Sequence, residues 1–384
     1  MRPAEETFQI ILSNNEVVWS RVISRILILF EDKRFFIGDN FIRTDSLRAF
    51  RSYFQHSKIH LNFSSACDKT IYEVLLKQNP NIDIVSVCEW NELSFTDYDI
   101  VFCIMPAEDL LFNFLHEQYK NLIPKGQLRF AVFSMSAIVL GKLRDAQYVF
   151  PIYKEFVDHI NSSGVNLPRE LYIAKEEREW GNVWLQNKGV KHNEKVFILF
   201  DATTSRNKLL PLDVYFEFLS SLLIMQDRKI LIFDENDIGK EMFYKEWLNH
   251  NEIDRIIFAK NVNLRETFSI LSSSYVRLIF GPCTGPMHCA SGIYNFYLKN
   301  SVCTPGDIPL IITYTGQYPA QDANAAFWWK NSPLVNCLLL RETVNGIELV
   351  TLDCLSEDER RSYHQIACSE YTSKMLIDFV NDKI

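Results

Sequence analysis

Three short stretches of the sequence combine hydroxyl, basic or carboxylate side chains with small residues that let a ligand approach the backbone. The first is FGPCTGPMHCASG, residues 280–292, where Thr284 and Gly285 separate an apolar run from a helix-like run. A glycine-containing turn that leads into a helix leaves backbone N–H groups free at the positive end of the helix dipole. The stretch is therefore suited to an anion such as a phosphate. The alternative is a tight turn in which Thr284 caps the helix and His288 is satisfied.

The second stretch is FDATTSRNKLLP, residues 200–211, after another apolar run. Two hydroxyls, Thr203 and Thr204, precede Arg206 and Lys208, and all four side chains can donate hydrogen bonds to phosphate oxygens. A solvated turn is the alternative. If both stretches follow strands of one parallel sheet, their loops lie at the same sheet edge and converge on one diphosphate.

The third stretch is EDKRFFIGDNFIRTD, residues 31–45. Here we expect Gly38 in a turn and Asp39 at the start of a helix, where a carboxylate is an ordinary N-cap held ionised by the helix dipole. A carboxylate on the opposite wall from a diphosphate site can also take a proton from an attacking hydroxyl.

The elements that position these stretches alternate between strand-length apolar runs and helical patterns, which indicates β-α-β units and parallel sheets. This predicts an α/β fold of two Rossmann-like domains that face each other across a cleft, with ligands at the carboxyl ends of the strands. The expected strands are residues 25–30, 58–63, 82–87, 99–104 and 128–133 in the first half, and 195–200, 229–234, 255–259, 277–281 and 309–316 in the second.

The predicted domain organisation has three parts. Residues 1–24 form an N-terminal extension, with a hairpin turned at Asn14–Asn15. Residues 25–185 form the first domain, and residues 186–384 form the second domain with a helical C-terminal tail. The boundary is placed at the end of a polar passage, near residues 185–194. We expect the aromatic AFWWK cluster at residues 326–330 to pack the two domains together.

Composition excludes several functions. A net charge of -8 gives no general attraction for nucleic acid or anionic lipid. The start of the chain does not have the pattern of a signal peptide, and its apolar runs are too short to span a membrane, so we expect a cytoplasmic protein. Nine scattered cysteines without a CxxC pair favour reduced, mostly buried thiols over disulfides or a zinc site. Asp97 and Asp99 form a DxD pattern, but they adjoin an expected strand and are interpreted as the end of a loop.

Taken in order, these motifs resemble glycosyltransferase family nine, the ADP-heptose:lipopolysaccharide heptosyltransferases. The resemblance covers residues 25–320, most of the chain, and its most specific parts are TGPMH and ATT with the lysine that follows. The matching positions are IGDN at 37–40, then Asn79, Pro80, Ile82, Asp83 and Val85, then ATT at 202–204 with Lys208, and finally TGPMH at 284–288.

The resemblance implies a GT-B fold and an inverting transfer of a sugar from an ADP-linked nucleotide diphosphate donor, with no metal in the chemical step and no other cofactor. The donor lies mainly in the second domain, and the acceptor, a lipopolysaccharide or other surface glycan, lies mainly in the first. Peripheral contact with the inner face of the cytoplasmic membrane is compatible with this acceptor, and nucleic acid is not expected as a partner.

The resemblance also implies roles for individual residues. Asp39 is the general base, and Lys208 offsets the diphosphate charge as the leaving group departs. A carboxylate after the second strand of the donor domain, Glu235 or Asp234, holds the ribose. The other donor-binding positions are Thr203, Thr204, Cys283, Thr284, Gly285, Met287 and His288.

Cys283 departs from the family pattern, which usually has aspartate before the Thr-Gly pair. A thiol is a weak donor and is mostly neutral near pH 7, so it does not replace a carboxylate as a charged acceptor for sugar hydroxyls. The sequence therefore leaves the identity of the donor sugar open.

Two other functions are alternatives to sugar transfer. One is a sugar-nucleotide 2-epimerase of GT-B architecture, for which we expect more carboxylates and histidines than a chain with eight His shows. The other is a non-catalytic or inactive protein that binds nucleotide sugars.

Overall fold

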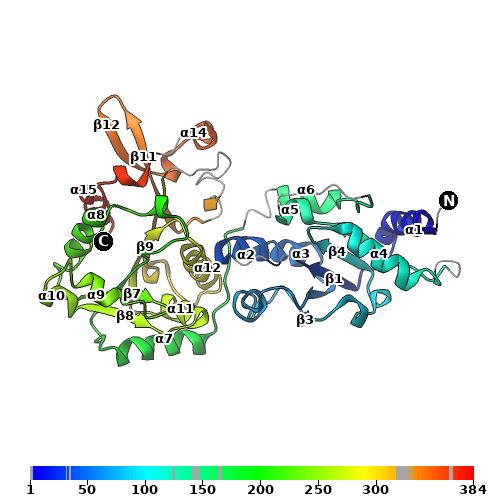
Figure 1. Ribbon diagram of the computed structural model, residues 1–384, viewed down its shortest axis with the longest axis horizontal. Coiled ribbons are helices and arrows are strands. Elements are labelled where there is room, and N and C mark those ends of the chain that lie inside the picture. Colours follow the sequence, from blue (N-terminus) through cyan, green and yellow to red (C-terminus); the bar gives the residue numbers. More distant parts are fainter. Residues whose placement is uncertain are drawn as a thin grey trace. The chain divides into compact units, whose positions relative to one another are not determined.

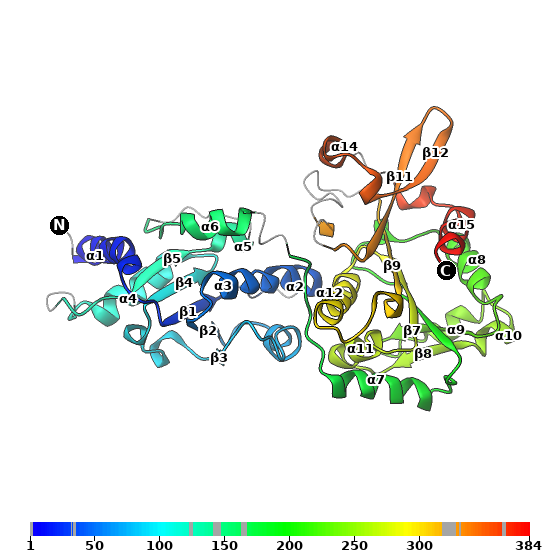
Figure 2. The ribbon, with the colours of Figure 1, turned by 180° about the vertical axis from the view of Figure 1, so that it is seen from behind.

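The computed structural model describes residues 3–31, 33, 36–122, 126–140, 147–162, 167–316, 328–329, 332–362 and 366–384. The chain divides into two compact units, residues 1–167 and 168–384 (Figures 1 and 2). The division falls before helix α7 (Lys175–Asn187), earlier than the boundary expected near residue 185. The reason is that α7 packs on α11 (Leu264–Leu271), with an Arg265–Glu177 ion pair of 2.7 Å.

The first unit contains a parallel sheet of five strands in the order β3-β2-β1-β4-β5. Its central strands are apolar on both faces, because helices cover both sides of a parallel sheet. The sequence predicted all five strands, which are β1 (Arg25–Phe30), β2 (Lys58–Phe63), β3 (Ile84–Val87), β4 (Ile100–Ile104) and β5 (Ala131–Ser134).

Helices pack on both faces of this sheet. On one face, α3 (Leu47–Tyr53) and α6 (Lys154–Asn161), with the partly buried α5 (Ser136–Leu140), cover Ile26, Ile28 and Phe102. On the other face, α1 (Pro3–Val17) and α4 (Glu108–Tyr119) cover Leu27, Leu29 and Val101. The remaining helical elements are α2 (Ile37–Asp45), η1 (Val18–Ser20), η2 (Ile71–Leu75), η3 (Trp90–Glu92) and η4 (Phe95–Asp97).

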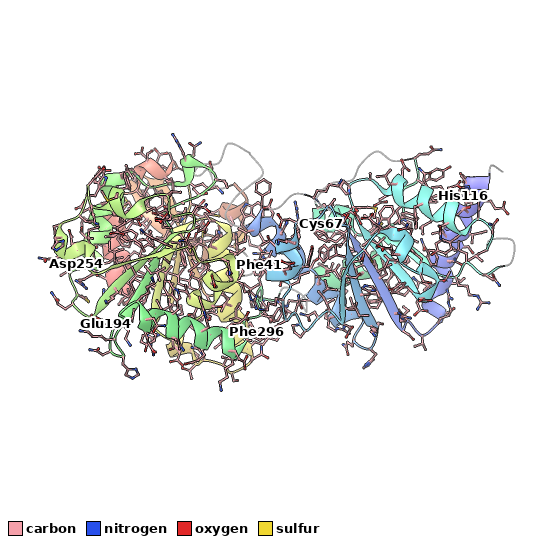
Figure 3. All side chains as sticks on the ribbon, turned by 60° about the horizontal axis from the view of Figure 1, so that its bottom comes forward. Phe41, Cys67, His116, Glu194, Asp254 and Phe296 are labelled. Carbon is pink, nitrogen blue, oxygen red and sulfur yellow. The ribbon has the colours of Figure 1, made fainter. Side chains whose placement is uncertain are left out.

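The hairpin expected at Asn14–Asn15 is wrong, because both residues lie in helix α1. The side chain of Asn15 accepts a hydrogen bond from the Val132 amide at 2.8 Å and donates to the Val132 carbonyl at 3.0 Å. Asn14 donates to the Leu128 carbonyl at 2.9 Å. Both asparagines therefore bind the backbone of strand β5 and the segment before it. Nearer the start of the same helix, the Thr7 hydroxyl is hydrogen-bonded to Nδ1 of His116 of α4 at 2.7 Å. His116 is labelled in Figure 3.

The second unit contains a sheet in the order β12-β11-β10-β9-β6-β7-β8, parallel except for the β11-β12 pair. The sequence predicted its first five strands and missed the last two, since the tail was expected to be helical. Val344 and Asn345 form the turn of a hairpin that extends the sheet, and Gly346, with φ of +113°, begins its second strand. The strands are β6 (Lys195–Leu199), β7 (Arg228–Asp234), β8 (Ile256–Lys260), β9 (Val276–Pro282), β10 (Leu310–Tyr314), β11 (Val335–Thr343) and β12 (Gly346–Thr351).

One face of this sheet packs against α8 (Leu212–Leu222), α9 (Lys240–Tyr244), α10 (His250–Ile253) and α15 (Ser373–Lys383). Helix α12 (Gly285–Lys299) packs on β9 and β10, and α11 packs on α12 and α7. In the tail, helices α14 (Glu357–Ser362) and α15 follow the hairpin. The shorter helical elements are η5 (Arg206–Lys208), η6 (Pro305–Asp307), η7 (Leu352–Cys354) and η8 (Cys368–Glu370).

Two other expectations concern the cysteines and the length of the helices. All nine cysteines are free; Cys88 is half-buried, Cys354 is exposed and the others are buried, which confirms the prediction of mostly buried thiols. None of the helices in the described ranges is long and apolar enough to cross a membrane.

Candidate functional site

The strand order of the second unit reverses between its central strands β6 and β9. From β6 the chain moves outward through β7 and β8, and then returns beside β6 to build β9 and β10. Ligands of such sheets bind outside the carboxyl ends of the strands at this switch point. The loop after β6 carries residues 201–208, and the loop after β9 leads through Cys283 and Thr284 into α12.

These two loops meet, as the sequence predicted. The Lys208 side chain donates from Nζ to the Cys283 carbonyl at 3.3 Å. The strands beneath the loops also lie unusually close, because a Cβ on Gly281 would come within 2.7 Å of Phe200 Cβ. In the loop after β6, Thr203 is half-buried and Thr204 is exposed.

The N-terminus of α12 presents unused backbone donors. The first helical hydrogen bond runs from the His288 amide to the Thr284 carbonyl at 3.3 Å, so the amides of Gly285 and Met287 precede it and have no acceptor within the helix. Thr284 occupies the N-cap position, but its side chain does not make the expected capping bond. Its Oγ1 is buried and has no hydrogen-bond partner among the described residues. Buried polar atoms are rarely left in this state unless a ligand or water binds them.

His288 also contradicts the interpretation of a satisfied core histidine. It is 5% exposed, and its Nδ1 is buried without a hydrogen-bond partner in the described part of the chain. Its ring stacks on Trp329, with 3.8 Å between ring centroids. Burial, and then the positive charges of Arg169 and Lys208, hold the pKa of His288 well below its usual range. The imidazole is therefore neutral, and two cations lie near the start of α12.

Sequence reasoning missed Arg169 and Trp329. Arg169 is 6% exposed and donates to the Trp328 carbonyl at 2.5 Å. It is a single arginine in the polar passage before α7, with no motif around it. Trp329 was expected to pack the two domains together, but it is buried within the second unit, where its Nε1 donates to Cys283 Sγ at 3.4 Å. Residues 326, 327 and 330 of the AFWWK cluster lie outside the described residues.

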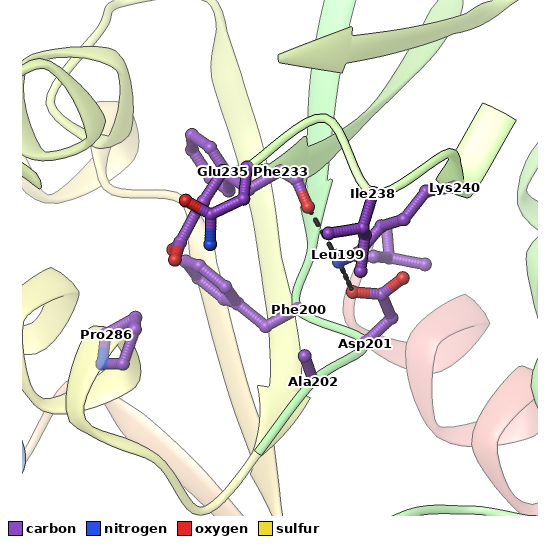
Figure 4. Close-up of a pocket in the computed structure, with 10 residues that line it drawn as sticks. Leu199, Phe200, Asp201, Ala202, Phe233, Glu235, Ile238, Lys240 and Pro286 are labelled. Atoms are coloured by element: carbon purple, nitrogen blue, oxygen red, sulfur yellow. Dashed lines mark hydrogen bonds and ion pairs between the residues drawn. The ribbon is translucent and has the colours of Figure 1, made fainter. Parts of the chain in front are cut away.

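A pocket of about 160 Å³ opens beside these loops, at the carboxyl ends of β6 and β7 (Figure 4). Of the two carboxylates expected to hold a ribose, the exposed Glu235 lines this pocket. Asp234 is fully buried and accepts hydrogen bonds from the amides of Ile238 at 2.9 Å and Lys240 at 3.2 Å. Asp234 therefore shapes the turn after β7. The lining comprises Leu199, Phe200, Asp201, Ala202, Phe233, Glu235, Asn236, Ile238, Lys240 and Pro286.

A second carboxylate in this pocket, Asp201, was not predicted. Its Oδ1 accepts from Lys240 Nζ at 2.5 Å, and its Oδ2 accepts from the Tyr244 hydroxyl at 2.8 Å. Lys240 Nζ also donates to the Phe233 carbonyl at 2.7 Å, and the two bonds of Lys240 are drawn in Figure 4. The Asp201 and Lys240 side chains are each 16% exposed. The pair is thus fixed in place and still open to the pocket.

Asp39 lies in the first unit, apart from the other candidates. Helix α2 begins at Ile37 with Phe36 as its N-cap, so Gly38 is inside the first helical turn, and Asp39 follows it there. The expectation of a turn at Gly38 and an N-cap at Asp39 is therefore wrong by two to three residues. A carboxylate in the first turn is still stabilised by the helix dipole, and Asp39 is half-buried.

Other predicted carboxylates have structural contacts. Asp99 Oδ2 accepts from the amides of Ser24 at 2.8 Å and Arg25 at 2.9 Å, so it fixes the start of β1. Asp83 accepts from the Ile59 amide at 2.7 Å and pairs with Arg51 at 2.5 Å. Across the described ranges, no group of three or more His, Cys, Asp or Glu side chains has the arrangement of metal ligands.

No protein-family model and no curated protein matches the sequence. Among solved structures, the chain is similar to the glycosyl transferase family 9 protein of Veillonella parvula DSM 2008, with 15% identity and a TM-score of 0.57 over 94% of this chain and 96% of that one. It is also similar to E. coli ADP-heptose lps heptosyltransferase II, with 12% identity and a TM-score of 0.55 over 93% of this chain and 98% of that one. These likenesses show the fold, which is the two-unit α/β fold of GT-B glycosyltransferases, as predicted.

Proposed function

We propose that this protein is an inverting glycosyltransferase that moves a sugar, a heptose or a similar one, from a nucleotide diphosphate donor to a hydroxyl of a lipopolysaccharide or other surface glycan. The donor is ADP-linked, and no metal takes part in the chemical step. The second unit binds the donor and the first binds the acceptor. The protein works in the cytoplasm, at the inner face of the cytoplasmic membrane where such an acceptor is available.

The start of α12 is the observation that carries this proposal. It combines the Gly285 and Met287 amides, which have no acceptor within the helix, with two buried side-chain atoms that lack a hydrogen-bond partner among the described residues, Thr284 Oγ1 and His288 Nδ1. Lys208 lies against the same turn. Backbone donors at a helix N-terminus, with a cation beside them, are complementary to a diphosphate. Thr203 and Thr204 add hydroxyl donors from the loop after β6.

The chemistry follows from these groups. Asp39 takes the proton from the acceptor hydroxyl, whose oxygen attacks the anomeric carbon of the donor sugar. The bond between that carbon and the diphosphate oxygen breaks, and the electron pair leaves with the nucleoside diphosphate. Lys208 and the α12 amides stabilise the negative charge that develops on the leaving group. Attack from the face opposite the leaving group inverts the configuration.

A second candidate function is nucleotide-sugar binding without transfer. The contact between Trp329 and Cys283 favours it, because a buried, packed cysteine occupies the position of the family's aspartate. In this case the diphosphate site is kept and sugar transfer is lost.

A donor screen tests both functions. Calorimetry with ADP-, UDP- and GDP-sugars measures binding, and detection of the released nucleoside diphosphate with a glycan acceptor measures transfer. Binding with transfer supports the enzyme, and binding without transfer to any acceptor supports the second candidate. Failure of all three donor classes to bind would exclude both.

A further inference from the structure

We infer that Asp201, held by Lys240 and Tyr244, is the carboxylate that accepts hydrogen bonds from the ribose hydroxyls of the nucleotide, and that Glu235 does not have this role. The inference rests on the proposed function, since it concerns the nucleotide of the same donor. It assigns recognition of the ribose to Asp201, a residue that is not among the matched motif positions.

The position of Asp201 suits a ribose. Only Ala202 separates it from Thr203, one of the hydroxyls proposed to contact the diphosphate. In a nucleotide the ribose is bonded directly to the α-phosphate, so its hydroxyls lie one sugar ring away from that group. Ala202 has only a methyl side chain, so it leaves room for the ligand between Asp201 and Thr203. Figure 4 shows Asp201 beside Ala202 at the pocket wall, with Pro286 from the first turn of α12 on the other side.

Asp201 is also preorganised. Lys240 and Tyr244 each occupy one acceptor position on a different carboxylate oxygen, so each oxygen keeps a further lone pair for a ligand. Burial raises the pKa of Tyr244 well above its usual range, so its hydroxyl stays protonated and donates to Asp201. Tyr215 bonds Tyr244 at 2.8 Å and is held protonated by burial in the same way. A carboxylate fixed in this manner loses little conformational entropy when it binds a hydroxyl.

Asp201 and Glu235 differ in whether a cation compensates their charge. The donor diphosphate is negative, and a nearby uncompensated carboxylate repels it. Asp201 is neutralised by the ammonium group of Lys240 at 2.5 Å. Glu235 is exposed, and in the described structure no Lys or Arg forms an ion pair with it. Its side chain would have to be ordered on binding, and its charge would oppose the diphosphate.

The test compares two nucleotides on three forms of the full-length protein. One probe is whichever of ADP, UDP and GDP binds most tightly, and the other is the 2′,3′-dideoxy analogue of that nucleotide. Calorimetry gives the Kd of each probe for wild type, Asp201→Asn and Glu235→Gln. We expect wild type to prefer the ribonucleotide by about tenfold, a factor typical of hydrogen bonds to a charged group. Asp201→Asn should lose this preference, whereas Glu235→Gln, the matched control in the same pocket, should keep it.

The possible results are distinguishable. If wild type binds none of the three nucleotides, the proposed function falls and the inference falls with it. If the nucleotide binds but Asp201→Asn keeps the preference, or loses affinity for both probes equally, the inference alone is overturned. A preference lost only in Glu235→Gln would assign the ribose to Glu235. Thermal melting checks the fold of each variant, and Asp201→Ser replaces Asp201→Asn in the same comparison if the latter does not fold.

Discussion

The indole nitrogen of Trp329 donates a hydrogen bond to the sulfur of Cys283, with 3.4 Å between the two atoms. Both side chains are almost completely buried, and the same indole stacks on the neutral imidazole of His288. The cysteine is therefore part of a buried, closely packed group at the start of α12. A carboxylate at this position would bring an unscreened charge into that group, which is costly unless a partner compensates it.

We therefore expect Cys283→Asp to lower the affinity for the native donor by about tenfold and to destabilise the fold by about 1–3 kcal/mol, as is typical of an imperfectly paired buried polar group. Donor calorimetry and thermal melting measure the two effects. Cys354→Asp, at the exposed cysteine, is the matched control and should change neither. A gain of transfer from ADP-heptose in Cys283→Asp would instead show that the cysteine marks a loss of the family's chemistry.

His288 predicts a pH dependence of stability. Burial, followed by the charges of Arg169 and Lys208, lowers its folded-state pKa well below the usual 6.5. Above pH 6.5, His288 is neutral in both the folded and the unfolded state, so it does not make the free energy of unfolding depend on pH. Below this pH, the unfolded chain binds a proton that the folded chain does not, so the free energy of unfolding falls by up to about 1.4 kcal/mol per pH unit.

Urea unfolding at pH 8.0, 6.5 and 5.5 measures this slope. His288→Gln should flatten it, and His250→Gln, at a histidine whose side chain is 89% exposed, should leave it as in wild type. Equal slopes for wild type and His288→Gln would show that the imidazole is not held neutral.

Much of this fold could be predicted because its signals are local. Apolar runs bounded by polar turns identified ten strands, and the order of β-α-β units determined which loops meet. The loops after β6 and β9 were thus brought together correctly, and Lys208 contacts the Cys283 carbonyl. The Asn345–Gly346 turn signal was present in the sequence and was overlooked.

Other features depend on contacts between distant residues and have no local signal. Asn14 and Asn15 read as a turn because their partners, the backbone groups of the β5 region, are more than a hundred residues away. Asp201 follows β6, whereas Lys240 begins helix α9 after β7, and only the pairing of β6 with β7 brings them together. Arg169 reaches α12 from an irregular segment and Trp329 from a short helical stretch at residues 328–329, and no periodic pattern predicts either contact.

Lys208 should determine affinity for the diphosphate. Lys208→Met removes a cation beside the α12 turn, and we expect the Kd of the bound nucleoside diphosphate to rise by about 10- to 100-fold, the range for hydrogen bonds to charged groups. The effect should shrink at high salt because screening weakens such attraction. Arg206→Met is the control in the same loop, at an exposed residue. Equal losses in both variants would indicate a diffuse basic loop without a specific contact.

Asp39→Asn should separate transfer from donor binding. Loss of a general base lowers turnover by about 10²- to 10⁴-fold, while donor affinity should not change, since the proposed donor site lies in the second unit. Product release with a glycan acceptor and donor calorimetry measure the two quantities. Asp97→Asn, at an exposed aspartate of the same unit, is the control. Turnover unchanged by Asp39→Asn would remove Asp39 as the base.

Gly281 links the stability of the second unit to its site. Its Cβ would lie 2.7 Å from Phe200 Cβ and 3.3 Å from the Phe200 carbonyl oxygen, so Gly281→Ala must push β6 and β9 apart where Phe200 leads into Asp201. We expect a loss of about 1–3 kcal/mol in the free energy of unfolding, typical of overpacking, together with weaker nucleotide binding, because both loops shift. Gly306→Ala, whose nearest heavy atom is Thr304 Oγ1 at 3.9 Å, is the control and should melt like wild type. Destabilisation of Gly281→Ala with unchanged nucleotide affinity would show that the spacing of these strands does not position the site.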